Sequence, residues 1–152
     1  MAGRTARVIG TSLEAIHKAE QEVGFSFPPS FRDWLEANNG RSVGSVARIY
    51  PVFDDRDPRT TWDSISRNFT QNWADWIENF TPSERERLGF GDLLPIAEVG
   101  DGDLYCFDYN KQTSEGEVPV VRWSHETGEK DIVATSFADL VEKLEDDELD
   151  DD

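Results

Sequence analysis

The sequence predicts a single α+β domain in which helices pack against an antiparallel, or mixed, sheet of about five strands. Segments near both ends of the chain and in its centre repeat apolar residues at helical spacing. Short runs rich in Val, Phe, Tyr and Trp, separated by turn residues, fill the stretch from Leu94 to Glu129. A chain of 152 residues without repeats or linkers is typical of one domain, which we place at residues 11–144.

Two helices are expected at the start of this domain. Thr11 and Glu14 match a capping box, which predicts a helix near 12–22. Proline is tolerated in a first helical turn, so Pro28-Pro29-Ser30 predicts a second helix near 30–38. The apolar face of this helix, at spacings of three and four, contains Phe31, Trp34 and Leu35.

A strand and a long helix are expected next. The strand, near 46–53, contains Pro51 and is therefore predicted to be an edge strand or a broken strand. Thr61 is expected to cap a helix near 61–80, whose apolar positions recur every three or four residues. These positions are Trp62, Ile65, Phe69, Trp73, Trp76, Ile77 and Phe80. We interpret this aromatic stripe as core packing rather than as a ligand-stacking surface. Thr81-Pro82-Ser83-Glu84 is a second capping box and predicts a short helix.

The second half of the chain predicts four strands and a closing helix. The strands lie near 93–97, 103–109, 118–124 and 130–134, and the helix, capped by Ser136, lies near 136–144. Gly100-Asp101-Gly102-Asp103 is expected to be a turn between two of the strands. Trp34, Trp73 and Leu140 are predicted to be core residues. We expect residues 1–10 to be flexible and the acidic residues 145–152 to be a disordered tail.

The charge restricts the partners of this protein. Thirty-two acidic against 15 basic residues give a net charge of −17, which repels nucleic-acid phosphates and anionic lipids. The same field would attract a basic partner, although acidity can also serve solubility alone. The basic residues near Met1 are not followed by the apolar h-region of a signal peptide, and the sequence has no run of 18 apolar residues. The single cysteine, Cys106, lies in a predicted apolar strand. We therefore expect a soluble cytoplasmic protein with a buried thiol.

Few residues are suited to catalysis or metal binding. The chain contains two histidines and one cysteine, and it lacks the Gly-x-Ser-x-Gly and His-Glu-x-x-His motifs. A pair of Cys106 and His125 across adjacent strands is the remaining nucleophilic alternative. Asp101, Asp103 and Asp108 are either calcium or magnesium ligands or turn residues, and their spacing departs from that of an EF-hand. We expect no catalytic residue, cofactor or metal site.

Motifs in both halves of the chain resemble the SMI1/KNR4, or SUKH, superfamily. They occur in the order of that family and span about residues 11 to 144. The matching residues are Ile16, Glu20, Gly24-Phe25, Pro28-Pro29, Phe31, Leu35, Asn38-Asn39-Gly40, Leu94-Pro95, Gly100-Asp101-Gly102, His125-Glu126-Thr127-Gly128 and Ser136-Phe137-Ala138-Asp139-Leu140. The resemblance implies an α+β binding module without shared catalytic residues. Many bacterial members are immunity proteins that neutralise a toxin, often a nuclease, and fungal relatives act in cell-wall regulation.

The resemblance and the charge together predict an immunity protein that binds and neutralises a basic, nucleic-acid-targeting toxin domain; the oligomeric state is left open, with a monomer favoured. The alternatives are another regulator or scaffold of the same family and, third, a metal-binding protein or hydrolase. We expect the partner to contact acidic residues of two loops at one rim of the sheet, with two aromatic residues as anchors. The acidic residues are Asp54, Asp55, Asp57, Glu98, Asp101 and Asp103, and the anchors are Trp62 and Tyr105.

Overall fold

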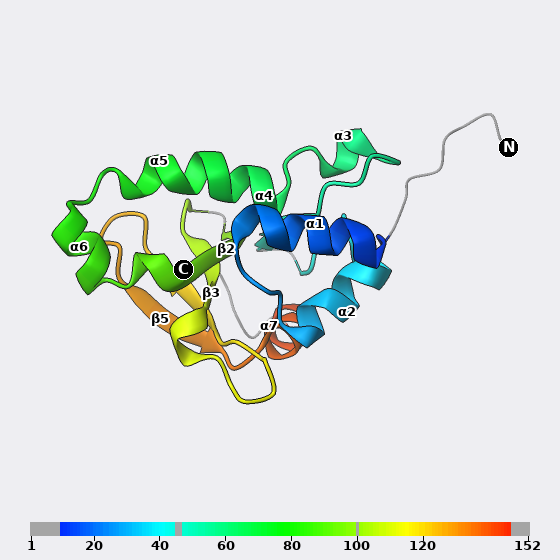
Figure 1. Ribbon diagram of the computed structural model, residues 1–152. Helices are drawn as coiled ribbons and strands as arrows, with labels where there is room; N and C mark the ends of the chain where they lie inside the picture. The colour runs from blue at the N-terminus through cyan, green and yellow to red at the C-terminus, as the bar shows by residue number, and fades with distance from the viewer. Residues whose placement is uncertain (1–9, 45–46, 100, 147–152) are drawn as a thin grey trace, which may run out of the picture.

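The computed structural model describes residues 10–44, 47–99 and 101–146, which form one antiparallel sheet with helices on both faces (Figure 1). The five strands pair in chain order, each antiparallel to the next. They are β1 (Ala47–Ile49), β2 (Leu93–Val99), β3 (Leu104–Asp108), β4 (Val120–Trp123) and β5 (Lys130–Ala134). This confirms the predicted single α+β domain.

The two faces of the sheet are covered by different helices. A first apolar cluster joins one face to α1 (Leu13–Val23), α2 (Pro29–Asn38) and α7 (Phe137–Glu145). A second joins the other face to the π-helix η1 (Asn68–Trp73), α5 (Ala74–Ile77) and the residues that follow. The remaining helices are short: α3 (Pro58–Thr61), α4 (Ile65–Arg67), α6 (Pro82–Arg87) and the 3-10 turns η2 (Phe90–Asp92) and η3 (Tyr109–Lys111).

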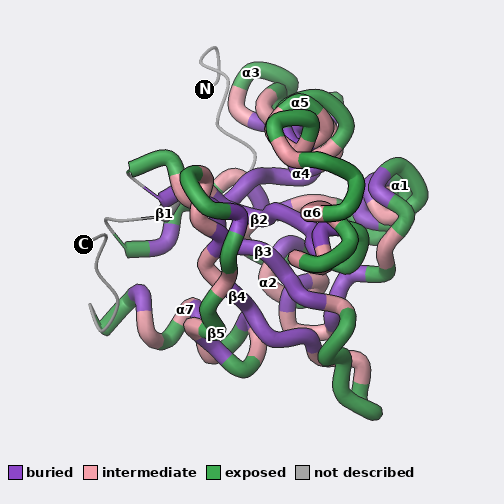
Figure 2. The backbone as a smooth tube through the Cα atoms, turned by 90° about the vertical axis from the view of Figure 1, so that its left-hand side faces the viewer, coloured by how far each residue is buried: buried purple, intermediate pink, exposed green. Residues whose placement is uncertain are grey.

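Strand β3 lies at the centre of the sheet, where both faces are covered (Figure 2). Successive side chains of a strand point to opposite faces. Tyr105 and Phe107 accordingly enter the first cluster, whereas Leu104 and Cys106 enter the second. All five residues of β3 are buried, which explains why its first four residues are apolar instead of alternating with polar residues.

The central helix differs from the prediction. Instead of one helix over 61–80, the chain forms the short α3, breaks at Ser64 and continues through α4, η1 and α5. Ser64 has extended backbone angles, and its hydroxyl accepts a hydrogen bond from the Arg67 N–H, so Ser64 is the N-cap. Thr61 is buried inside the preceding turn and its hydroxyl donates to the Asp57 carbonyl. The apolar repeat alone did not reveal this competing cap.

The first cap and the first strand also differ in detail. Ser12, not Thr11, caps α1 by accepting from the Ala15 N–H. The Thr11 hydroxyl instead donates to Asp54 Oδ2 at 2.8 Å, a tertiary contact that competes with capping. Strand β1 is an edge strand, as predicted, but it ends at Ile49, before Pro51. The predicted capping box of α6 is confirmed.

The predicted core residues occupy two environments. Trp73 and Leu140 are buried, whereas Trp34 is half-buried and packs against the first cluster. Of the predicted terminal segments, residues 1–9 and 147–152 lie outside the described residues. Glu145 is the last residue of α7 and therefore belongs to the described domain.

Candidate partner-binding surface

The segment from Trp62 to Trp73 forms a ridge between two depressions. We call the first depression the hollow; it has a volume of about 680 Å³ and lies between the ridge and the β1–β2 edge of the sheet. The second, which we call the groove, has a volume of about 1370 Å³ and lies between the ridge and α1. Asn68 and Asn72 face the hollow, whereas Trp62 and Arg67 face the groove.

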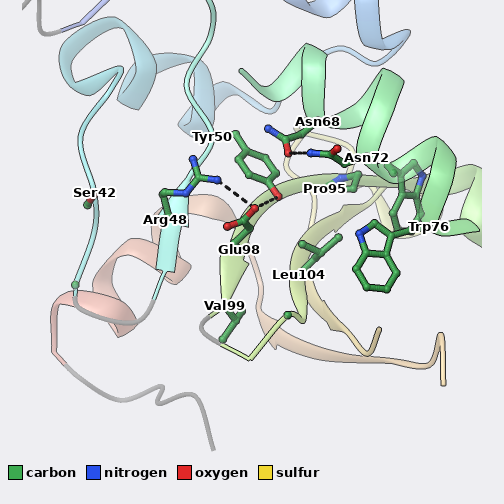
Figure 3. A pocket seen from close by; sticks show the side chains of 13 residues that line it. Ser42, Arg48, Tyr50, Asn68, Asn72, Trp76, Pro95, Glu98, Val99 and Leu104 are labelled. Atoms are coloured by element: carbon green, nitrogen blue, oxygen red, sulfur yellow. Dashed lines mark hydrogen bonds and ion pairs between the residues drawn. The ribbon is translucent and has the colours of Figure 1, made fainter. Parts of the chain in front are cut away.

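Figure 3 shows the hollow, whose floor comes from the sheet. Arg48, Glu98 and Leu104 are cross-strand neighbours on β1, β2 and β3, so their side chains share one face. Trp76 and Asn72 enter from the helices on the opposite side. Asn72 Nδ2 donates to Asn68 Oδ1 at 2.7 Å, which orients the Asn72 amide. The hollow thus combines an ion pair, an amide and an indole ring.

A chain of alternating charges connects the ridge to the hollow. Arg67 contacts Asp63 at 3.2 Å and Asp63 contacts Arg48 at 2.8 Å, while Arg48 contacts Glu98 at 3.1 Å. The Tyr50 hydroxyl donates to the same Glu98 oxygen at 3.4 Å. Burial, and then the charge of Glu98, raises the pKa of Tyr50, so this hydroxyl stays protonated. Glu98 is the acidic end of the chain of charges.

Exposed apolar side chains line the groove. Phe53 and Trp62 line it with 39% and 62% of their surface exposed, although large apolar residues are usually buried. Leu13, 49% exposed, lies beside it at the start of α1. Among the described residues, the other large apolar side chain that is exposed is Ile132 on β5. Two of these four side chains, Phe53 and Trp62, therefore line one depression, which is typical of a binding surface.

Acidic residues border the groove. Asp54 lines the groove and is paired with Arg56, and the groove residue Arg67 is paired with Asp63. Within the described part of the chain, the groove residues that have no ion-pair partner are the acids Glu14, Glu22 and Asp55 and the base Lys18. The unpaired charge of the groove is therefore negative.

The residues considered for catalysis and metal binding do not line either depression. Cys106 is fully buried in the second cluster, and burial raises the pKa of its thiol well above the ordinary value. His125 instead contacts Asp103. Among the described residues, no three His, Cys, Asp or Glu side chains are grouped to hold a metal, and no helix is long and apolar enough to cross a membrane.

The model of the SMI1 / KNR4 family (SUKH-1) matches residues 10–143. The chain belongs to the SMI1/KNR4 family. The match begins before α1 and includes most of α7, so the hollow and the groove both lie within the family domain.

Four of the expected residues of this SMI1/KNR4 domain lie in the loop after β1 or directly follow it, and two of the four are exposed on the groove. These are Asp55 and Trp62, both exposed. Asp54 is 5% exposed and accepts hydrogen bonds from Thr11 and Arg56, so it is part of the fold and not a free surface charge. The Arg56 guanidinium, outweighing burial, holds the pKa of Asp54 far below its usual value. Asp57 is half-buried at the start of α3.

The acidic residues of the β2–β3 turn lie at the other depression. Glu98 lines the hollow, and Asp101 and Asp103 flank Gly102 at its edge. Both aspartates are bound to the guanidinium of Arg122, at 2.7 and 3.0 Å. The two loops therefore border different depressions on either side of the ridge, and not one shared rim as the sequence suggested.

Tyr105 is not available as an anchor. It is 1% exposed and belongs to the first cluster, because β3 is covered on both faces. Phe53 was not among the predicted binding residues, and Trp76 was predicted only as part of the aromatic core stripe. Phe53 follows four buried residues, Ile49 to Val52, so no alternation of apolar and polar residues marks its side chain as outward-facing. No local pattern distinguishes Trp76 from the buried Trp73.

Proposed function

We propose that this protein is an immunity protein that neutralises a basic toxin domain by binding it, without catalysing a reaction. The proposal agrees with membership of the SMI1/KNR4 family and with the net charge of −17. A toxin that cleaves nucleic acid requires a basic surface to hold phosphates, and an acidic protein complements that surface.

The observation that carries the proposal is the exposure of Trp62 and Phe53 in a groove with unpaired acids. Interfaces typically combine a few large aromatic anchors with a polar rim, and the anchors contribute most of the binding free energy. Trp62 is 62% exposed, and the Arg67 guanidinium lies 5.6 Å from its ring centroid. This contact orients the indole before a partner arrives, which reduces the entropy lost on binding.

The acidic residues have a different role from the aromatic residues. Asp55 and Glu14 are exposed, and both line the groove. Exposed charges of this kind increase the association rate constant with a basic partner, and salt weakens the effect. Trp62 is expected to affect mainly the dissociation rate constant, because its side chain becomes buried only when the partner is bound.

The test measures binding to, and inhibition of, the basic toxin domain encoded next to the gene for this protein. Trp62→Ala should raise the dissociation constant by roughly 30-fold, the effect of losing an interface hot spot. Ile132→Ala is the matched control, because Ile132 is 57% exposed but lies on β5, away from the groove. The control should bind like the wild type.

A second pair of variants tests whether the acidic residues of the groove speed the association with a basic partner. Asp55→Lys should lower the association rate constant several-fold at low salt and little at high salt. Glu115→Lys makes the same charge change in an exposed loop distant in the chain from every groove residue, and should have a smaller effect.

If the neighbouring toxin neither binds the wild type nor is inhibited by it, the immunity function is wrong and a regulatory or scaffold role replaces it. If binding and inhibition occur but Trp62→Ala changes nothing, the groove is not the interface.

A further inference from the structure

We propose that the hollow binds an arginine side chain presented by the protein partner. The inference deepens the proposed function and rests on it for the source of the arginine. It assigns a separate site, across the ridge from Trp62, and a specific chemical group to it.

Two polar side-chain atoms in the hollow have no hydrogen-bond partner among the described residues, and both are acceptors. Both contacts of the Glu98 carboxylate, from Arg48 and from the Tyr50 hydroxyl, use Oε1. Asn72 donates through Nδ2 to Asn68. Among the described residues, Glu98 Oε2 and Asn72 Oδ1 therefore accept no hydrogen bond, although both groups line the hollow. A ligand that supplies several N–H donors satisfies them best.

The charges of the hollow also favour a cation. Arg48 lies in the hollow but keeps Asp63 as a partner at 2.8 Å if Glu98 turns to another cation. The chain from Arg67 through Asp63 and Arg48 to Glu98 is neutral and ends on a carboxylate that is 46% exposed. An arriving cation would be the next charge of opposite sign after Glu98, and it meets no unpaired positive charge among the described residues that line the hollow.

The indole ring of Trp76, which lines the hollow opposite the sheet, favours arginine over other cations. Trp76 is half-buried, and its ring is held edge-on against His125 and Trp123 at centroid distances of 5.8 and 6.1 Å. A planar guanidinium stacks on an indole and can donate to two acceptors at once, whereas an ammonium is a compact point charge. The apolar residues Val99 and Leu104 line the same hollow and would contact the methylene stem.

The experiment titrates the complete protein with a minimal probe, Nα-acetyl-arginine N-methylamide, and follows the indole N–H signal of Trp76 by NMR. The matched probe is the citrulline analogue, which has nearly the same shape without the charge. We expect saturable, millimolar binding of the arginine probe and at least fivefold weaker binding of the citrulline and lysine analogues.

Two variants locate the site. Glu98→Gln keeps the side-chain length and an acceptor for Tyr50, and it should weaken binding of the arginine probe about tenfold. Glu78→Gln removes the same charge from an exposed position directly after α5, outside the hollow, and should bind like the wild type. Thermal unfolding of both variants verifies that they are folded.

The inference is overturned if the arginine probe does not shift the Trp76 signal, if citrulline or lysine binds equally well, or if Glu98→Gln binds like wild type. These outcomes are distinguishable from failure of the proposed function. A toxin that binds wild type and Glu98→Gln equally, but loses affinity for Trp62→Ala, leaves the immunity function intact and removes the hollow from its interface. Probe binding without any toxin partner supports the site alone and contradicts the proposed function.

Discussion

Asp103 and His125, 22 residues apart, are joined at one carboxylate oxygen. The His125 ring Nδ1 lies 2.6 Å from Asp103 Oδ1, and the His125 backbone N–H donates to the same oxygen at 3.1 Å. Arg122 Nε donates to the other oxygen at 3.0 Å. Asp103 therefore fastens the β2–β3 turn, at the edge of the hollow, to the end of β4.

The first prediction is that Asp103→Asn destabilises the domain in a pH-dependent way. Partial burial raises the pKa of Asp103, but the hydrogen bonds from His125 and Arg122 outweigh it and hold the pKa below its ordinary value of 3.8. A depressed carboxyl pKa stabilises the folded state above the unfolded pKa, and the stabilisation is lost as the pH falls through the folded pKa. We expect the variant to lose about 1–3 kcal/mol of unfolding free energy at neutral pH.

The measurement is urea unfolding of wild type and Asp103→Asn from neutral pH to about pH 3, where the difference should shrink. Asp131→Asn is the control, because Asp131 is exposed on β5 and makes no side-chain hydrogen bond among the described residues. An equal effect of both substitutions would show that the contacts of Asp103 do not stabilise the fold.

The second prediction concerns the buried ion pair of Lys130 and Asp108. Lys130 Nζ lies 2.9 Å from Asp108 Oδ2, and Asp108 is fully buried. Lys130→Met leaves a buried carboxylate without its cation and should cost about 3–5 kcal/mol of unfolding free energy. Adding Asp108→Leu removes the stranded charge, so the double variant should be more stable than Lys130→Met. Strictly additive losses in denaturant unfolding would contradict this coupling.

The third prediction separates core from surface tryptophans. Trp73 is 4% exposed and packs on Trp123 at a ring-centroid distance of 4.9 Å. Trp73→Ala should therefore cost about 3–5 kcal/mol. Trp62→Ala, at a position 62% exposed, should change stability by no more than about 0.5 kcal/mol. Thermal and urea unfolding compare the two, and an unchanged stability of Trp73→Ala would remove Trp73 from the core.

The fourth prediction uses three glycines to separate backbone strain from steric overlap. Gly128 has a φ of +75°, and an added Cβ would lie 2.9 Å from both Phe80 Cε1 and Phe90 Cζ. Gly24 has a φ of +79° but open space around it, and Gly91 has open space and no positive φ. We expect Gly24→Ala to cost about 1 kcal/mol, Gly128→Ala clearly more, and Gly91→Ala almost nothing. Equal losses at Gly24 and Gly128 would mean that the aromatic cluster adjusts freely.

The types and order of most elements were predictable because they depend on local chemistry. The four strands after residue 90 were found from Val and aromatic residues between turn signals, and each turn residue imposes its backbone preference whatever surrounds it. The capping box of Thr81 and Glu84 likewise involves four consecutive residues, and it forms as expected. The family resemblance was visible for the same reason, since its motifs are short and ordered.

The tertiary structure decided which residues are accessible and which hydrogen bonds prevail. Thr11 and Thr61 are residues that often cap helices, but their hydroxyl groups donate to Asp54 and to the Asp57 carbonyl instead. Ser12 and Ser64 therefore become the N-caps of the two helices. Asp54 and Asp55 are adjacent and chemically identical, yet one is held by Thr11 and Arg56 while the other faces the groove. Tyr105 is buried because helices cover both faces of β3. Burial depends on which elements pack over a residue, and segments distant in the chain supply those elements.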